Sequence, residues 1–316
     1  MKTHPFFTKQ IPTYMGNKRK FIPTLDLLLD TLPPLESIAD GFSGTGVVAR
    51  LFKTRAKSKL YVNDLAGYSK TFNQCYLSKN PPSNLASYIE EANRFADNDT
   101  PIVPKWIQIH WAPPANSPVE IHHRVYYTPE NAKRIDRYRF FIQRAPKKIQ
   151  PFLLAPLLVE CSIHTNTSGQ FAAFYKKNKI GHYGGKTETD VKRITQPIKL
   201  SLPPNPPITK QPPPTIHISQ QDVNHWIKNI PPVDLLYLDP PYNKHPYSIY
   251  YFMLDIINNW DTTQEIPDTL RGQPKNWKKS PYNSFRNATE SFKDLIKSAK
   301  AKYILISYNN GGIIPL

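Results

Sequence analysis

The chain has 316 residues, with 41 Lys and Arg against 24 Asp and Glu, a formal net charge of +17 and a pI near 9.6. This length accommodates one large domain, or a core domain with an insertion. The charge favours a polyanionic partner, with nucleic acid ahead of an anionic membrane surface. Because the sequence has neither a run of about 18 apolar residues nor the start of a signal peptide, we expect a soluble, cytoplasmic protein. Cys75 and Cys161 have no metal-like spacing, so neither a disulfide nor a metal site is predicted.

The first segment with chemistry-bearing residues is Tyr14-Met15-Gly16-Asn17-Lys18-Arg19-Lys20, which precedes a helix predicted over 23–32. A glycine and an amide just before a helix let the backbone approach a ligand carboxylate, and Lys18 adds a positive charge. A basic, solvated turn is the alternative interpretation.

A glycine-rich turn follows a short strand at 37–40. Its sequence, Asp40-Gly41-Phe42-Ser43-Gly44-Thr45-Gly46, leads into an apolar helix, so Gly44 and Gly46 permit close approach of a cofactor at the helix start. The spacing differs from the G-x-G-x-x-G dinucleotide fingerprint. A second strand, 60–63, ends in Asp64, where a carboxylate commonly holds a ribose diol. An ordinary βαβ unit with a polar strand end would give the same pattern.

Residues 81–214 interrupt the alternation of strands and helices with a segment rich in aromatic and basic residues. Basic groups bind phosphates and aromatic rings stack on unpaired bases, so residues 124–148 suit a nucleic-acid surface. The alternative is a helix, beginning near Thr128 and Pro129, with a solvated basic face. Residues 203–214 contain seven prolines and read as a stiff linker back to the core. The candidate DNA-binding residues are Arg124, Lys133, Arg134, Arg137 and Arg139.

The core resumes with a strand at 215–218, then Asp222, which is either a contact to the adenine of a cofactor or the N-cap of a helix at 223–228. The apolar run 235–238 predicts a buried parallel strand that ends in Asp239-Pro240-Pro241-Tyr242. The two prolines make a rigid corner at the carboxyl end of the strand, where open α/β sheets bind ligands. A carboxylate, proline carbonyls and an aromatic face there suit a planar base with an exocyclic amine. Further helices are predicted over 247–260 and 292–299, and a buried strand over 303–308.

Taken in order, these motifs resemble the Dam-like class of S-adenosylmethionine-dependent DNA adenine methyltransferases, of the restriction-modification type. The resemblance implies an α/β, Rossmann-like methyltransferase core from residues 1–80 and 215–316, with a target-recognition insertion at 81–214. It implies catalysis at Asp239, Pro240, Pro241 and Tyr242 on a flipped adenine in double-stranded DNA. It implies S-adenosylmethionine contacts from Tyr14, Gly16, Asn17, Lys18, Asp40, Phe42, Gly44, Gly46, Asp64 and Asp222.

Two alternatives remain, which are methylation of the cytosine N4 amine and a non-catalytic DNA-binding module of the same fold. Relatives of this class continue past a strand equivalent to 303–308 into a helix and a β-hairpin, whereas this sequence stops at Leu316. We therefore expect an exposed sheet edge that a partner chain or self-association covers.

Overall fold

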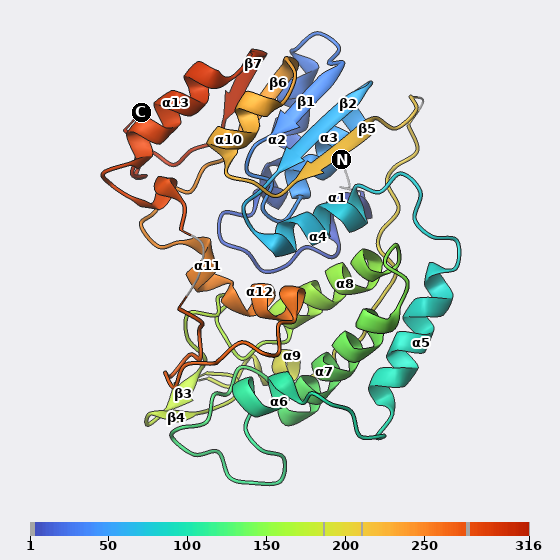
Figure 1. Cartoon of the computed structure of the whole chain (residues 1–316), viewed down its shortest axis with the longest axis vertical. Coiled ribbons are helices and arrows are strands. Elements are labelled where there is room, and N and C mark those ends of the chain that lie inside the picture. The colour runs from blue at the N-terminus through green and yellow to red at the C-terminus, as the bar shows by residue number, and fades with distance from the viewer. Residues whose placement is uncertain (1–3, 186, 210, 276–278, 316) are drawn as a thin grey trace.

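The computed structural model describes residues 4–185, 187–209, 211–275 and 279–315. Within these residues, a parallel five-stranded sheet in the order β5-β2-β1-β6-β7 forms the centre of one half of the molecule (Figure 1). This arrangement confirms the predicted Rossmann-like α/β core. The strands are β1 (Ser37–Asp40), β2 (Lys59–Asn63), β5 (Thr215–Ser219), β6 (Val233–Leu238) and β7 (Ala301–Ile306).

Helices cover both faces of the sheet, which explains why β6 is apolar at consecutive positions. All six residues of β6 are buried. Leu235 and Tyr237 pack into a cluster with α2 and α3, whereas Leu236 and Leu238 pack into a cluster with α10 and α13. The covering helices are α2 (Ile22–Asp30), α3 (Val47–Arg55), α10 (Val223–Asn229) and α13 (Ala288–Ser298).

The strand predicted as buried at 303–308 is instead an exposed edge. β7 pairs only with β6 among the described strands, and Tyr303, Ile304 and Ile306 are 39%, 37% and 42% exposed. Its apolar sequence is compatible with a central strand, but the strand order places it last in the sheet. The prediction of a buried strand was therefore wrong, although the strand itself forms.

The other half of the molecule is helical and comes mainly from the segment between β2 and β5 (Figure 1). Its buried cluster also contains Tyr68 and Phe72 of α4 and Phe252 of α12, so packing crosses the chain positions expected to separate core from insertion. Residues 203–209 and 211–214 form neither helix nor strand. The elements of this half are α4 (Gly67–Tyr76), α5 (Leu85–Asp97), α6 (Trp106–Trp111), α7 (Pro129–Arg144), α8 (Gln150–Ile163), β3 (Lys176–Lys177), β4 (Ile180–Gly181), α9 (Val191–Thr195) and α12 (Phe252–Asn259).

Short elements lie at the chain's beginning and around the loops that follow β6. They are α1 (Pro5–Thr8), the 3-10 helix η1 (Lys18–Phe21), α11 (Tyr247–Tyr250) and the 3-10 helix η2 (Pro281–Asn283). The helix predicted over 247–260 is thus split into α11 and α12 at Tyr251.

Arginines of α7 lie inside the helical half rather than on its surface. Arg134, Arg137 and Arg139 are only 4%, 1% and 5% exposed. The Arg137 guanidinium donates to the carbonyl oxygens of Phe95 at 2.7 Å and Thr100 at 2.6 Å, and it lies over the Phe95 ring. Guanidinium groups tolerate such burial because their donors fit fixed carbonyl acceptors and their flat faces stack on aromatic rings.

Arg134 is also held by a carbonyl acceptor, whereas Arg139 is held by a ring contact. Arg134 donates to the Ile198 carbonyl at 2.7 Å and pairs with Asp97, while Arg139 lies over the Trp260 ring. The burial of these three arginines argues against the prediction that they bind DNA phosphates. Arg134 and Arg137 instead hold α5, α7 and the chain near residue 198 together, and Arg139 packs on Trp260.

We expect Arg137→Ala to lower the free energy of unfolding by about 3 kcal/mol or more, since each hydrogen bond from a charged donor contributes roughly 1.5–3 kcal/mol. Urea unfolding followed by circular dichroism measures this change. The exposed Lys148 provides the control, because Lys148→Ala should change stability by at most about 0.5 kcal/mol. An Arg137→Ala protein of normal stability that binds DNA poorly would contradict this structural role.

Candidate active site

The turn after β1 is a backbone cradle fastened to β2. Gly44 and Gly46 have φ angles of +50° and +75°, values that side-chain-bearing residues rarely adopt, and Gly46 is the N-cap of α3. A Cβ on Gly46 would lie 2.7 Å from Asn73 Oδ1. Asp64 Oδ2 accepts a hydrogen bond from the Gly44 amide at 2.7 Å, so the carboxylate at the end of β2 holds the turn in shape.

Asp64 combines burial with good hydrogen bonding. Its Oδ1 accepts from the Ala66 amide at 2.9 Å. Burial raises the pKa of Asp64, while the amides of Ala66 and Gly44 oppose that shift. Both oxygens thus have a backbone partner, and the carboxylate lines the cavity.

The carboxyl ends of β1 and β6 bring two more carboxylates to the same end of the sheet. The strands pair in parallel with Asp40 opposite Tyr237, and the Gly41 amide donates to the Tyr237 carbonyl at 3.0 Å. Asp40 is fully buried, and its Oδ2 has no hydrogen-bond partner. Burial raises the pKa of Asp40, and the nearby Asp239 raises it further.

Asp239 is paired with a lysine from the beginning of the chain. Lys18 Nζ lies 2.8 Å from Asp239 Oδ1 and 2.8 Å from Oδ2, and it also donates to the Gly16 carbonyl at 3.2 Å. Burial raises the pKa of Asp239, whereas the Lys18 charge and hydrogen bond act in the opposite direction. The pair keeps a negative charge tolerable at a mostly buried position.

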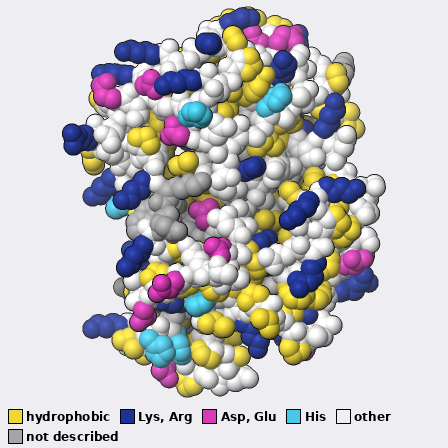
Figure 2. Space-filling model, in the orientation of Figure 1, with side chains coloured by type: hydrophobic (Ala, Val, Ile, Leu, Met, Phe, Trp, Pro, Cys, Tyr) yellow, Lys and Arg dark blue, Asp and Glu magenta, His cyan; other side chains and the backbone are white. Residues whose placement is uncertain are grey.

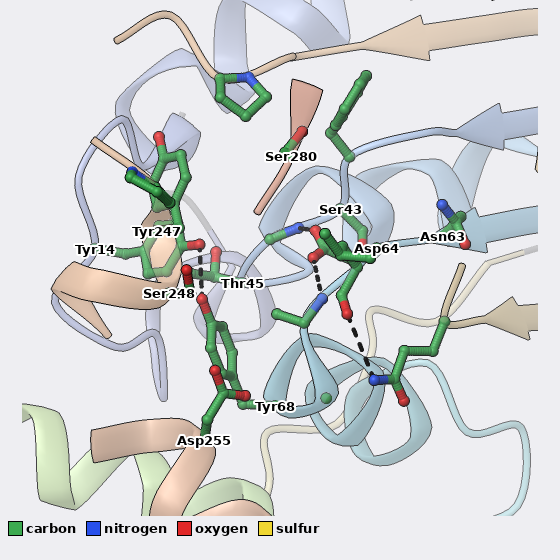
Figure 3. A pocket seen from close by; sticks show the side chains of 18 of the residues that line it. Tyr14, Ser43, Thr45, Asn63, Asp64, Tyr68, Tyr247, Ser248, Asp255 and Ser280 are labelled. Atoms are coloured by element: carbon green, nitrogen blue, oxygen red, sulfur yellow. Dashed lines mark hydrogen bonds between the residues drawn. The ribbon is translucent and has the colours of Figure 1, made fainter. Parts of the chain in front are cut away.

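A cavity of about 420 Å³ lies between these elements. Asp239 and Pro241 line it, as do nine of the ten residues that the sequence assigned to a cofactor: Tyr14, Gly16, Asn17, Lys18, Asp40, Phe42, Gly44, Asp64 and Asp222. Figure 3 shows Tyr14 and Tyr247 on one side of this space and Ser43 and Asp64 on the other. Residues far apart in the sequence thus meet around a single site.

The remaining predicted residues lie beside the cavity. Gly46 ends the glycine turn as the N-cap of α3, and Pro240 is buried. The Tyr242 side chain packs against the turn at Gly16, where an added Cβ would lie 2.9 Å from the Tyr242 hydroxyl. Asp222 caps α10, accepting from the amides of Asn224 and His225, which confirms the N-cap interpretation. It also lines the cavity, and its contact to the adenine of a cofactor stays a prediction.

An aromatic stack forms one wall that the sequence did not predict. The Tyr14 ring stacks with Tyr247, at 5.1 Å between centroids, and with Tyr251, at 4.2 Å, and the latter two rings are 6.0 Å apart. The Tyr14 hydroxyl is 3.1 Å from that of Tyr68, and the Tyr251 hydroxyl accepts from the Met15 amide at 2.6 Å. Burial raises the pKa of Tyr251 to about 12, so this hydroxyl stays neutral. The four-residue spacing of Tyr247 and Tyr251 was the available signal.

The two other predicted DNA-binding residues lie away from this cavity. Arg124 donates to the carbonyls of Thr269, Pro267 and His110, with its side chain 14% exposed, and therefore serves to hold a loop. These contacts do not favour its assignment to DNA phosphates, which stays a prediction. Lys133 is partly exposed and pairs with Asp99.

A parallel sheet with a glycine turn after β1 and a carboxylate–proline–proline–tyrosine corner after β6 defines a Rossmann-like methyltransferase. The chain belongs to the D12 class N6 adenine-specific DNA methyltransferase family, whose model matches residues 14–309. Its reaction is methylation of adenine at N6 in DNA, which requires a methyl donor, and the predicted family and activity are confirmed.

Similar proteins carry the names of modification enzymes. The chain is 28% identical to Type II methyltransferase M.NlaIII of Neisseria lactamica over 323 residues, covering 96% of this chain and 85% of that protein. It is 27% identical to Type II methyltransferase M.CviAII of Paramecium bursaria Chlorella virus 1 over 308 residues, covering 95% and 84%. It is 25% identical to Modification methylase LlaI of Lactococcus lactis subsp. lactis over 316 residues, covering 96% of this chain and 47% of that protein. Across the described part of the chain, no helix has the length and apolar character needed to cross a membrane.

Proposed function

We propose that this protein uses S-adenosylmethionine to methylate an adenine that is flipped out of double-stranded DNA, as the modification enzyme of a restriction-modification system. The carrying observation is the cavity that joins the glycine turn to the Asp239 corner. The names of the similar proteins support the restriction-modification setting. A cytoplasmic location follows from the proposed substrate.

The cavity suits the donor in size and in polar groups. Its volume of about 420 Å³ lies within the usual range for small-molecule sites. Asp40 Oδ2, which is buried without a partner, is an acceptor for the donor's amino group, and Lys18 is a cation for its carboxylate. The turn at Gly44, fastened by Asp64, lets the backbone approach the ligand closely. When bound, the donor supplies an electrophilic methyl group attached to a positively charged sulfur.

Asp239 and Tyr242 are the proposed base-binding residues. Asp239 and the Pro240 carbonyl accept the two hydrogens of the adenine amine, which leaves its lone pair directed at the methyl group. Tyr242 presents an aromatic face to the base. Attack is direct and in line: the N6–methyl bond forms as the sulfur–methyl bond breaks, and N6 then releases one proton. The protein contributes mainly positioning and a buried acceptor.

Exposed basic residues close in sequence to Lys18 and to the proline corner replace the buried arginines as proposed DNA contacts. Arg19 and Lys20 are exposed on η1, the same turn whose Lys18 reaches Asp239, and Lys244 and His245 are exposed just after the proline corner. Figure 2 shows Lys and Arg side chains spread over both halves of one face. These basic residues next to Asp239 are therefore better candidates for DNA contacts than the residues of the basic segment 124–148.

We predict that Asp239→Ala abolishes methyl transfer without weakening donor binding, because the lost acceptor serves the adenine. Tyr242→Ala should retain transfer but slow it, with a stacking loss of about 1–3 kcal/mol. Transfer of a labelled methyl group to DNA and calorimetric titration with donor measure the two properties. Near-normal turnover of Asp239→Ala would refute the assignment, and a wild-type protein that binds DNA but no donor would indicate a non-catalytic module.

Replacement of Arg19 and Lys20 by alanine should weaken DNA binding and reduce the slope of log K against log salt by about 0.9 for each lost phosphate contact. Fluorescence anisotropy at several salt concentrations measures the slope. The matched control removes the exposed Lys147 and Lys148, which have the same charge. Equal slopes for the two double variants would argue against special contacts by Arg19 and Lys20.

The exposed face of β7 supports the further proposal that a second polypeptide, either a partner or another copy, covers this edge. Unpaired strand edges with apolar side chains such as Ile304 and Ile306 favour pairing with another chain. Light scattering on the purified chain should therefore give a mass above that of one chain. A fully active monomer at micromolar concentration would contradict the proposal.

A further inference from the structure

Lys18 contacts the carboxylate that the target amine must reach. Its ammonium donates hydrogen bonds to Asp239 Oδ1 and to the Gly16 carbonyl, and its charge is paired with Asp239 Oδ2 at 2.8 Å. An ammonium 2.8 Å from both oxygens stands where an adenine amine would donate. It also draws electron density from the acceptor that is needed to orient the amine.

The charges that line the cavity suggest a second partner for Lys18, the carboxylate of the donor. Among the described residues that line the cavity, Lys18 is the only Lys or Arg, whereas six aspartates line it: Asp40, Asp64, Asp222, Asp239, Asp255 and Asp261. A donor with an amino-acid end brings a carboxylate into this acidic surrounding. Lys18 is the lining cation available to pair with it, but its charge is already paired with the Asp239 carboxylate.

We propose that Lys18 is a positioning residue that couples donor binding to base binding by exchanging Asp239 for the donor's carboxylate. The backbone at Lys18 is fixed because Asn17 caps η1 through a 2.8 Å bond to the Arg19 amide, so the exchange is a rotation of the lysine side chain. S-adenosylmethionine carries two positive groups and one negative group, and its net positive charge replaces that of Lys18 beside Asp239. The amine acceptor is thus exposed to adenine when the donor is in place.

This inference rests on the proposed donor site, and the experiment separates the two. Calorimetry measures the Kd of S-adenosylhomocysteine, which has the carboxylate, and of 5′-methylthioadenosine, which lacks the whole amino-acid end. Asp239→Asn should tighten S-adenosylhomocysteine binding by about tenfold, because Lys18 no longer gives up a charged hydrogen bond. It should leave methylthioadenosine binding unchanged.

A double-mutant cycle removes the general effect of deleting a negative charge. In a Lys18→Met background, Asp239→Asn should change the Kd of S-adenosylhomocysteine less than about twofold. In a background of Lys20→Met, an exposed residue on the same turn, the full effect should return. Thermal unfolding checks that each variant is folded. If Lys18→Met does not fold, Lys18→Gln replaces it in the cycle.

The outcomes are distinct. If the wild-type protein binds neither compound, the proposed donor site is wrong. If it binds both, but Asp239→Asn does not tighten S-adenosylhomocysteine, or tightens it equally without Lys18, then the exchange is wrong and the donor site stands.

Discussion

The parallel pairing of β1 with β6 sets the central constraint of this protein, because it places the buried Asp40 and the mostly buried Asp239 side by side at the carboxyl ends of these strands. Two carboxylates in such surroundings repel each other, and burial penalises the charge on each. The structure meets this cost with a lysine from a different segment, which donates a hydrogen bond to Asp239 Oδ1 and lies 2.8 Å from Oδ2. Asp40 keeps one oxygen without a partner. The site therefore has a buried carboxylate oxygen without a hydrogen-bond donor, which a positively charged group of the proposed donor would supply.

The surrounding elements hold these strand ends in place. Asp64 fastens the glycine turn, and two prolines stiffen the exit from β6. Tyr14, which stacks with both Tyr247 and Tyr251, supports the segment that carries Lys18. The tyrosines also connect the sheet half to the helical half, since Tyr251 belongs to the buried cluster that includes α4 and α8. The residues proposed to bind the donor and the base are thus positioned by packing that extends across both halves.

Local patterns were enough to predict the strands, the glycine turn and the proline corner, since consecutive apolar residues and breakers act over a few positions. They were not enough for Arg134 and Arg137, because their acceptors at residues 198, 95 and 100 come from other segments. The contact between Lys18 and Asp239 joins residues 221 positions apart, so the sequence placed each at the site without showing that they pair. Likewise the composition of β7 indicated a strand, but its place at the edge depends on sheet order.

The most direct test of this account is the identity of the modified base. Purified protein, S-adenosylmethionine and unmethylated genomic DNA, which contains every short recognition sequence, are incubated together, and the released nucleosides are analysed by mass spectrometry. The account predicts N6-methyladenine with the wild-type protein and none with Asp239→Ala. N4-methylcytosine in place of N6-methyladenine, or equal N6-methyladenine from both proteins, would contradict it.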